Sequence, residues 1–459
     1  MDVKLETIVE FVHVARQQPL RENVAAAAVR HFVDGLGCAA GGLRSTGPAK
    51  LTAAFGGLQS ERSASGCGMD EKVSVYAAAI INSSMARALD YNDTYIRVPS
   101  GHPNDMTPAL FALAESIGAS GEEFLRASWI SYEIFAALSD VAPIRDRGWD
   151  QGIQCSTGVA AAGSYLLDLS PEQTANAISL ALTPALPMRV VRTGELSEWK
   201  GCATAHAGMT ALMAVDMARA GLTGPPMPFD GVDGLCALAT GPFKLEVPSH
   251  STRSAFDDTL VKHFPAELSS QVPIEIALAL RDEGLDPASV TSIEIDIHRL
   301  GWTEIGGGQG DVDEKWHPTT RETADHSLPY IFAAALVDAA ITPHTFAEQR
   351  LSDPRLADLI AVTHVREDPE LTERLASDQA LATRITVRTG AGEEIVREQD
   401  HPLGAPARQM TRADIEEKAR PMLSQVLGRP GVDELLSAAW DLPAAARLDD
   451  VAGLMRALT

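Results

Sequence analysis

The chain has 459 residues, more than one compact core normally holds, so two or three domains are expected. Apolar residues make up 45% and charged residues 22%, a composition typical of globular proteins and not of disordered ones. The formal net charge of −24 (38 basic against 62 acidic side chains) repels nucleic acid and anionic membranes, so neither is expected as a partner. An anionic substrate would need cations gathered locally at its site.

The cysteines indicate a reducing environment. All five are scattered, and no two form a C-x-x-C pair (Cys38, Cys67, Cys155, Cys202 and Cys236). This pattern favours neither a disulfide framework nor a zinc site, so no metal is expected. The first residues do not resemble a signal peptide, and no run approaches the roughly 18 apolar residues of a membrane helix. We therefore expect a cytoplasmic protein.

The first half of the chain is predicted to be helical. Residues 5–220 read as successive helices separated by glycine and polar turns, with runs of alanine that favour close helix packing. The clearest start signal is Ser170, followed by proline at the first helical position and by Gln173 at the third. This signal predicts a helix over residues 172–182.

The pattern changes beyond about residue 265. Residues 290–298 alternate apolar and polar side chains, which predicts a half-buried strand. Residues 382–388 and 394–397 flank a glycine-containing turn and predict a hairpin. Helical patterns occupy residues 330–340 and return from Arg412 onwards. We therefore expect a mainly α protein in which an α+β segment interrupts a helical chain.

The densest polar cluster combines residues 90–94 with residues 101–105. Because residues 76–89 have a helical pattern, Asp90 and Thr94 would share one helix face if that helix continued. His102 lies between Gly101 and a proline, with little freedom to retreat into a core. Histidine and carboxylate together favour general acid–base chemistry near neutral pH. The alternative is that the aspartates cap a helix and the histidine lies on an ordinary loop.

Two further clusters are rich in cations. Residues 189–206 contain Arg192 and Lys200; arginine suits bidentate carboxylate binding, and lysine can move protons. Lys262 lies near the expected domain boundary, and Tyr330 ends the segment 325–330. The alternatives are a solvated loop for the first cluster, a linker cation for Lys262 and a helix-capping turn around Tyr330.

The common cofactor signatures do not occur. The sequence contains no phosphate-binding loop, no dinucleotide-binding glycine motif, no H-E-x-x-H and no G-x-S-x-G. We therefore expect no cofactor, with side chains alone performing any chemistry.

Five of these segments, in order, resemble the MmgE/PrpD family, which includes 2-methylcitrate dehydratase, cis-aconitate decarboxylase and iminodisuccinate epimerase. They are residues 89–94, 101–105, 194–201, 262–267 and 326–330. Each segment is weakly specific, but together they extend the resemblance over nearly the whole chain. It implies a helical domain from residues 1–265 and 404–459, an α+β lid domain from residues 266–403, and a homodimer.

The resemblance also implies an active site between the domains. It places Asp90, Thr94, His102, Lys200, Lys262 and Tyr330 there. With Arg192 and Asp105 added from their own sequence clusters, we expect Asp90, His102, Lys200 and Tyr330 to be catalytic, and Thr94, Arg192, Lys262 and Asp105 to bind substrate. Decarboxylase-type members tend to have a histidine where this chain has Gln154. Asp105 and the Phe-Pro-Ala-Glu segment at residues 264–267 resemble the dehydratase branch instead.

The expected function is a cofactor-independent hydro-lyase that eliminates water from a small 2-hydroxy polycarboxylate such as 2-methylcitrate, as in propionate metabolism. Lys200, Lys262 and Arg192 would hold carboxylates. Asp90 or His102 would act as base, and His102 or Tyr330 would protonate the departing hydroxyl. The alternatives are an epimerase or a decarboxylase of a related di- or tricarboxylate, or a non-catalytic helical binding protein.

Overall fold

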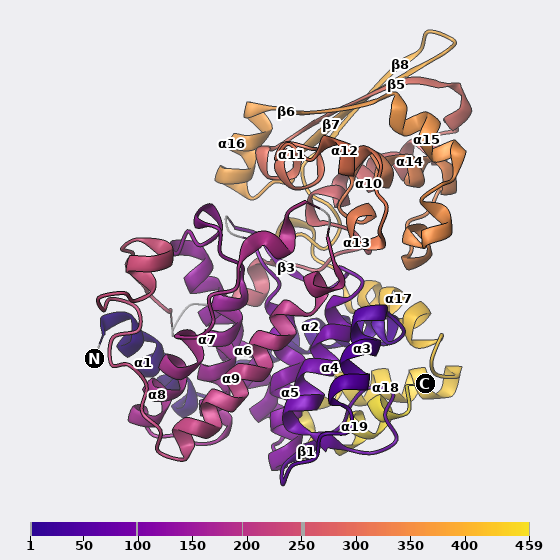
Figure 1. Ribbon diagram of the computed structural model, residues 1–459. Helices are drawn as coiled ribbons and strands as arrows, with labels where there is room; N and C mark the ends of the chain where they lie inside the picture. Colours follow the sequence, from indigo (N-terminus) through magenta and orange to yellow (C-terminus); the bar gives the residue numbers. More distant parts are fainter. Residues whose placement is uncertain (1, 98–99, 195, 249–252, 459) are drawn as a thin grey trace. The chain divides into compact units, whose positions relative to one another are not determined.

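The computed structural model describes residues 2–97, 100–194, 196–248 and 253–458 (Figure 1). The chain divides into two compact units. Unit 1 comprises Met1–Val191, Gly201–Leu260 and Thr411–Thr459, and unit 2 comprises Arg192–Lys200 and Val261–Met410. Segment Arg192–Lys200 thus groups with unit 2, although the sequence analysis kept it in the helical domain. Helices dominate the secondary structure, which confirms the mainly α fold class.

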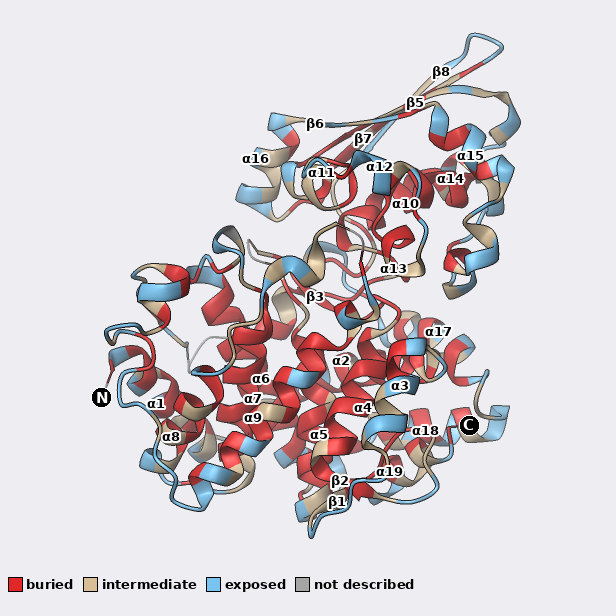
Figure 2. Ribbon diagram, in the orientation of Figure 1, coloured by how far each residue is buried: buried red, intermediate tan, exposed pale blue. Residues whose placement is uncertain are grey.

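Unit 1 is a stack of helices with almost no sheet. Of the residues in its central helix α4, only Tyr76 is not buried, and Figure 2 shows α4 and α5 in the buried colour. Alanine and glycine allow this close packing; a Cβ on Gly37 would lie 2.8 Å from that of Ala419. The helices are α1 (Val3–Gln17), α2 (Glu22–Gly42), α3 (Thr46–Phe55), α4 (Val75–Arg87), α5 (Thr107–Ile117), α6 (Gly121–Val141), α7 (Gly152–Leu166), α8 (Pro171–Leu182), α9 (Ala203–Arg219), α17 (Arg412–Leu423), α18 (Arg429–Trp440) and α19 (Asp449–Arg456).

The short strands of unit 1 form two antiparallel pairs. Strand β1 (Ser63–Ala64) pairs with β2 (Val73–Ser74), and β3 (Thr94–Tyr95) pairs with β4 (Thr259–Leu260). Thr94 lies opposite Leu260 in the second pair. This pairing fixes the backbone at the start of the polar loop that follows β3.

The capping signal at Ser170 is confirmed. The Ser170 hydroxyl accepts a hydrogen bond from the Gln173 amide, and the Gln173 side chain accepts one from the Ser170 amide. These reciprocal bonds satisfy two amides that the first turn leaves unpaired, so α8 begins at Pro171 and ends at Leu182.

The prediction that Asp90 and Thr94 share one helix face is wrong. Helix α4 ends at Arg87, and Asp90 adopts a left-handed backbone conformation with φ of 51°. This conformation cannot continue a right-handed helix, and aspartate tolerates it better than most residues. Thr94 therefore lies on β3 and not on the helix.

Unit 2 is built around a four-stranded sheet of order β6-β5-β7-β8. Strands β5 and β6 are parallel, whereas β5–β7 and β7–β8 are antiparallel, so the expected strand and hairpin are confirmed. The strands are β5 (Val290–Ile297), β6 (Thr363–Glu367), β7 (Thr383–Thr389) and β8 (Glu394–Gln399), and the helices are α10 (Gln271–Asp282), α11 (Arg299–Ile305), α12 (Val312–Trp316), α13 (Arg321–Ala324), α14 (Leu328–Asp338), α15 (Pro354–Ala361) and α16 (Pro369–Asp378).

No helix in the described ranges has both the length and the apolar character needed to cross a membrane.

Candidate active site

His102 lies in the loop that follows β3 in unit 1. The backbones of Tyr95 and Gly101 exchange two hydrogen bonds and close this loop. The His102 amide donates to Oε1 of Gln151 at 2.6 Å. A Cβ on Gly101 would lie 2.4 Å from the same Oε1 atom, so only glycine permits this approach. The loop thereby holds the imidazole with a small exposed fraction of 13%.

The two ring nitrogens of His102 have different partners. Nδ1 lies 2.8 Å from the backbone oxygen of Asp93, which can only accept, so Nδ1 carries a proton. Nε2 lies 2.9 Å from Nη2 of Arg87, which can only donate. In the neutral ring, Nε2 therefore presents its lone pair. The tautomer is thus fixed, and the Nε2 lone pair accepts a hydrogen bond from Arg87.

Arg87 was not foreseen in the sequence analysis. It is 2% exposed, forms an ion pair with Asp90, and places Nε 3.8 Å from Oδ2 of Asp105. A guanidinium cannot lose its charge, so burial requires nearby carboxylates. An arginine in the last turn of an otherwise uncharged helix, three residues before an aspartate, was the signal that could have identified it.

The remaining residues expected in this cluster lie around His102. Oγ1 of Thr94 is 3.1 Å from His102 Nδ1, and Oδ1 of Asp90 is 3.9 Å from its Nε2. Asp105 accepts a hydrogen bond from the Asn92 amide group at 2.7 Å. Unit 1 thus brings together Asp90, Thr94, His102 and Asp105, and adds Arg87.

A fully buried carboxylate supports the loop. Oδ2 of Asp93 accepts a hydrogen bond from the Tyr132 hydroxyl at 2.7 Å and lies 2.6 Å from His31 Nδ1. Its Oδ1 accepts from the Asn104 amide at 3.1 Å. Because the backbone oxygen of Asp93 contacts His102, these bonds also position the imidazole. Sequence alone did not separate Asp93 from its neighbours Asp90 and Asp105.

Unit 2 contains the second cluster, centred on Asp325. Lys200 lies in a short 3₁₀ turn (Glu198–Gly201) and donates to Asp325 Oδ1 at 2.7 Å. Nδ1 of His326 is 3.0 Å from the Lys200 ammonium and 2.7 Å from the same Oδ1. Nη1 of Arg321 lies 3.5 Å from Oδ2. Two basic side chains, Lys200 and Arg321, thus lie beside one buried carboxylate, an arrangement that suits an anionic ligand.

The charge state of Asp325 follows from these contacts. Burial alone would raise the pKa of this carboxyl, but Lys200 and His326 outweigh that effect and lower the pKa to about 2. Asp325 and His326 carry atoms that can bind metals. The Lys200 ammonium, however, already supplies a cation to both of them.

The other expected residues of unit 2 have separate environments. Nη1 of Arg192 donates to the backbone oxygen of Lys200 at 2.9 Å. Lys262 is 1% exposed and follows Val261, whose amide donates to the Gly404 oxygen. Of the segment 194–201, Glu195 lies outside the described residues.

Tyr330 is buried near the start of α14. Its hydroxyl donates to the backbone oxygen of Thr345 at 2.7 Å, and its amide donates to Ser327 Oγ. Burial raises the pKa of the Tyr330 phenol to about 12. These contacts give the side chain a packing role in unit 2, and its catalytic role stays a prediction.

Gln154, the position that differs from decarboxylase-type sequences, lies on α7 in unit 1. It is 1% exposed, and its Oε1 accepts no hydrogen bond from the residues that the structure describes. The amide therefore retains an unused acceptor in a buried place.

Curated relatives of the chain are enzymes by name. Human cis-aconitate decarboxylase (Homo sapiens) is 25% identical over 378 residues, covering 78% of this chain and 75% of that protein. A 2-methylcitrate dehydratase from Escherichia coli is 27% identical over 359 residues, with coverages of 71% and 70%. A mitochondrial 2-methylcitrate dehydratase from Yarrowia lipolytica is 26% identical over 428 residues, with coverages of 88% and 80%.

Family comparison covers nearly the whole chain. Residues 6–248 match the MmgE/PrpD N-terminal domain, and residues 264–442 match the MmgE/PrpD C-terminal domain. Both polar clusters fall within these ranges. The chain therefore belongs to the MmgE/PrpD family.

Proposed function

We propose that this protein is a cofactor-independent hydro-lyase that removes water from a small 2-hydroxy polycarboxylate such as 2-methylcitrate. The observation that carries the proposal is His102, whose tautomer is fixed so that Nε2 is the basic atom, beside a buried arginine–carboxylate pair. The similarity to proteins named 2-methylcitrate dehydratase supports the substrate class.

The reaction begins with a proton removed next to a substrate carboxylate. Nε2 of His102 accepts this proton when its hydrogen bond from Arg87 breaks, and the negative charge left on the carbon is delocalised onto the neighbouring carboxylate. Lys200, Lys262 and Arg192 hold the carboxylates and stabilise that charge. The electron pair of the broken C–H bond then forms the C=C bond.

The departing hydroxyl needs a proton to leave as water. The His102 imidazolium formed in the first step can supply it. Tyr330 is the other candidate, but its hydroxyl is engaged by the Thr345 oxygen, and burial raises its pKa to about 12. These two facts favour His102 as the acid, with Asp90 balancing the charge of Arg87.

Proton NMR in D₂O distinguishes this activity from its alternatives. Incubated with 2-methylcitrate, citrate, cis-aconitate and iminodisuccinate in turn, a dehydratase yields an alkene from a hydroxy acid without loss of CO₂. A decarboxylase releases CO₂ and places deuterium on carbon. An epimerase exchanges deuterium into the α position without forming an alkene. Deuterium exchange in iminodisuccinate alone would replace the proposal with epimerisation.

Two substitutions test the assigned residues. His102→Ala and Lys200→Ala should each lower kcat/KM by at least about 100-fold, the typical contribution of one positioned proton transfer or charge contact. The exposed residues His317 and Lys50 provide matched controls, since His317→Ala and Lys50→Ala should leave turnover unchanged. Circular dichroism would verify the helical fold of each variant. Near-normal kinetics in His102→Ala or Lys200→Ala would remove that residue from the mechanism.

Cofactor independence is tested by metal removal. Since the Lys200 ammonium lies within hydrogen-bonding distance of Asp325 and His326, we expect full turnover after dialysis against EDTA. The measurement is alkene formation before and after dialysis. Loss of activity that Zn²⁺, Mg²⁺ or Fe²⁺ restores would show that the reaction needs a metal ion.

A further inference from the structure

Helix α2 carries two polar residues in a stretch where most residues are buried. His31 is 3% exposed and Asp34 is 1% exposed, and their spacing of three positions puts them on one face of the helix. Burying a polar side chain costs free energy unless it forms hydrogen bonds. The proposed reaction uses neither residue, so their partners indicate what this face of α2 supports.

The side chain of His31 contacts the chain before His102. Nδ1 of His31 lies 2.6 Å from Oδ2 of Asp93, which can only accept when ionised, so this Nδ1 carries a proton. The ring packs against Tyr132 and Phe256, with ring centroids 5.6 Å and 5.1 Å apart. Because this packing fixes the plane of the imidazole, its hydrogen bond also fixes the direction of the Asp93 carboxylate.

The backbone of His31 contacts the chain after His102. The side-chain amide of Asn104 donates to the His31 backbone oxygen at 2.6 Å, and the backbone amide of Asn104 donates to Asp93 Oδ1 at 3.1 Å. One turn further along α2, a Cβ on Gly35 would lie 2.2 Å from Asn104 Oδ1, so only glycine permits this close approach. A single residue of α2 thus binds the chain on both sides of His102.

Asp34 supports a further point of the same region. It pairs with Lys418 at 2.5 Å, and the Lys418 ammonium donates to the backbone oxygen of Tyr91 at 2.7 Å. This contact reaches the chain two positions before Asp93. The face of α2 that bears His31 and Asp34 therefore supports the polar segment from residue 91 to residue 93.

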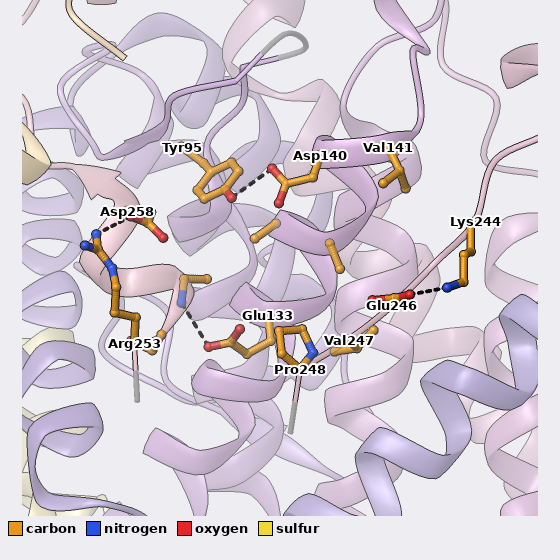
Figure 3. Close-up of a pocket in the computed structure, with 14 residues that line it drawn as sticks. Tyr95, Glu133, Asp140, Val141, Lys244, Glu246, Val247, Pro248, Arg253 and Asp258 are labelled. Carbon is orange, nitrogen blue, oxygen red and sulfur yellow. Dashed lines mark hydrogen bonds and ion pairs between the residues drawn. The ribbon is translucent and has the colours of Figure 1, made fainter. Parts of the chain in front are cut away.

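Tyr95 is held separately, by helix α6. Its hydroxyl donates to Oδ1 of Asp140 at 3.0 Å, as Figure 3 shows, and its backbone exchanges two hydrogen bonds with Gly101. These bonds fix the backbone next to His102. Nδ1 of the His102 imidazole, in contrast, lies 2.8 Å from the backbone oxygen of Asp93, so the orientation of the ring depends on the contacts that α2 makes with Asp93.

We propose that His31 is a positioning residue, which keeps His102 in the tautomer that leaves Nε2 as the basic atom. The Nδ1–H group of His31 orients Asp93, and the His31 backbone oxygen holds Asn104, so the Asp93 backbone oxygen stays in line with Nδ1 of His102. This role rests on the proposed function, because it affects catalysis only if His102 is the base. The tautomer itself can be measured without substrate.

Three substitutions of His31 separate its hydrogen bond from the packing of its ring. Asparagine and leucine are nearly equal in size, and the asparagine amide can place a donor where Nδ1 of His31 lies. Phenylalanine keeps a ring but has no donor. In ¹⁵N NMR of the free protein at pH 8, His102 should stay a single Nδ1–H tautomer in the wild type and in His31→Asn. In His31→Leu and His31→Phe it should populate both tautomers.

Turnover supplies a second readout. His31→Leu and His31→Phe should each lower kcat at least about 10-fold, because misplacing a catalytic group by about 1 Å can cost more than that. KM should change less than about 3-fold, since His31 does not touch the substrate, and His31→Asn should keep kcat within about 3-fold. His317→Leu is the matched control: Nδ1 of His317 lies 3.1 Å from Asp313 Oδ1 in an exposed pair, so its loss should change neither kcat nor the His102 tautomer.

The outcomes separate positioning from packing. A wild-type tautomer in folded His31→Leu and His31→Phe would overturn the proposal, and so would a loss of kcat in His31→Asn as large as that in His31→Leu. If one donor-free variant does not fold, the other supplies the comparison; failure of both would show general support of unit 1 and also overturn the positioning role. If the wild type forms no alkene from any hydroxy acid, the proposed function fails, whereas the tautomer comparison still decides what His31 does.

Discussion

At the scale of single residues, the site depends on residues that hold the catalytic side chains in place, such as Asp93, which contacts His102. The backbone oxygen of Asp93 holds Nδ1 of His102, while its buried carboxylate is fixed by Tyr132, His31 and the Asn104 amide. A buried carboxylate with this many partners resists displacement. Asp93 is therefore a positioning residue, and the reactivity of His102 depends on it.

Substitution of Asp93 should change catalysis beyond its effect on stability. In Asp93→Asn, the new amide group faces Tyr132 and His31 where a carboxylate oxygen accepted from them, so we expect a loss of roughly 1–3 kcal/mol of stability. The loop should shift, lowering kcat at least about 10-fold and altering the pH–rate profile through His102. Tyr132→Phe removes one of the same bonds and serves as the milder comparison.

The pH–rate profile decides between positioning and simple structural support. If folded Asp93→Asn protein keeps the wild-type profile and loses only stability, the carboxylate does not orient the imidazole. A profile that changes in Asp93→Asn and less in Tyr132→Phe would support the positioning role.

Distance along the chain determines which site residues the sequence could and could not predict. His102, Asp90 and Thr94 stand close together in the chain, so the sequence grouped them, although the helix face expected to join Asp90 and Thr94 does not form. Lys200 and Asp325 are 125 positions apart, and no local pattern links them. Arg87 was hidden because one charged residue at the end of a buried helix resembles an ordinary helix end.

At the scale of elements, the sequence predicted a helix or strand correctly where residues close together in the chain determine it. The α8 start depends on Ser170 and Gln173 alone, and the β7–β8 hairpin depends on its turn, so both were predictable. The end of α4 was not predictable, because the left-handed backbone conformation of Asp90 is stabilised by the ion pair of Asp90 with the buried Arg87. Tertiary contacts there override the helical pattern.

The loop between β3 and α5 depends on glycine at residue 101. Gly101→Ala would place a Cβ 2.4 Å from Gln151 Oε1 and 2.6 Å from the Phe135 ring, so the loop must move. Gln151 Oε1 accepts a hydrogen bond from the His102 amide, so movement of the loop should displace the imidazole. We expect at least about a 10-fold loss of kcat/KM, because misplacing a catalytic group by about 1 Å can lower the rate by more than that. Gly57→Ala is the matched control, because its Cβ would meet nothing within 4 Å. Steady-state kinetics that are equal in both variants would contradict this account of the loop.

At the scale of the whole molecule, unit 1 joins segments from both ends of the chain. Helix α17 packs against α2, and Lys418 of α17 lies 2.5 Å from Asp34 Oδ1 on α2. Its ammonium also donates to the Tyr91 oxygen at 2.7 Å and lies 4.0 Å from the centroid of the Tyr91 ring. Helix α17, from the C-terminal segment of unit 1, is thus tied to α2 and to Tyr91. Sequence predicted helices after Arg412 but not this buried ion pair, whose partners are far apart in the chain.

Lys418→Met should therefore destabilise unit 1 strongly. Removing one partner of a buried ion pair costs about 3–5 kcal/mol, because the other charge is left without compensation. Burial already raises the pKa of Asp34, and Lys418 opposes that rise, so the substitution should raise this pKa further. Protonation then removes the uncompensated charge, and the loss should be smaller at pH 5 than at pH 8. Urea unfolding at both pH values measures this loss of stability.

Two further variants serve as controls. Arg447→Ala, which breaks an exposed ion pair with Asp449, should cost less than about 1 kcal/mol of stability. Asp34→Leu combined with Lys418→Met should recover part of the stability lost in Lys418→Met. A loss in Lys418→Met no larger than in Arg447→Ala would show that this ion pair does not secure the chain's end.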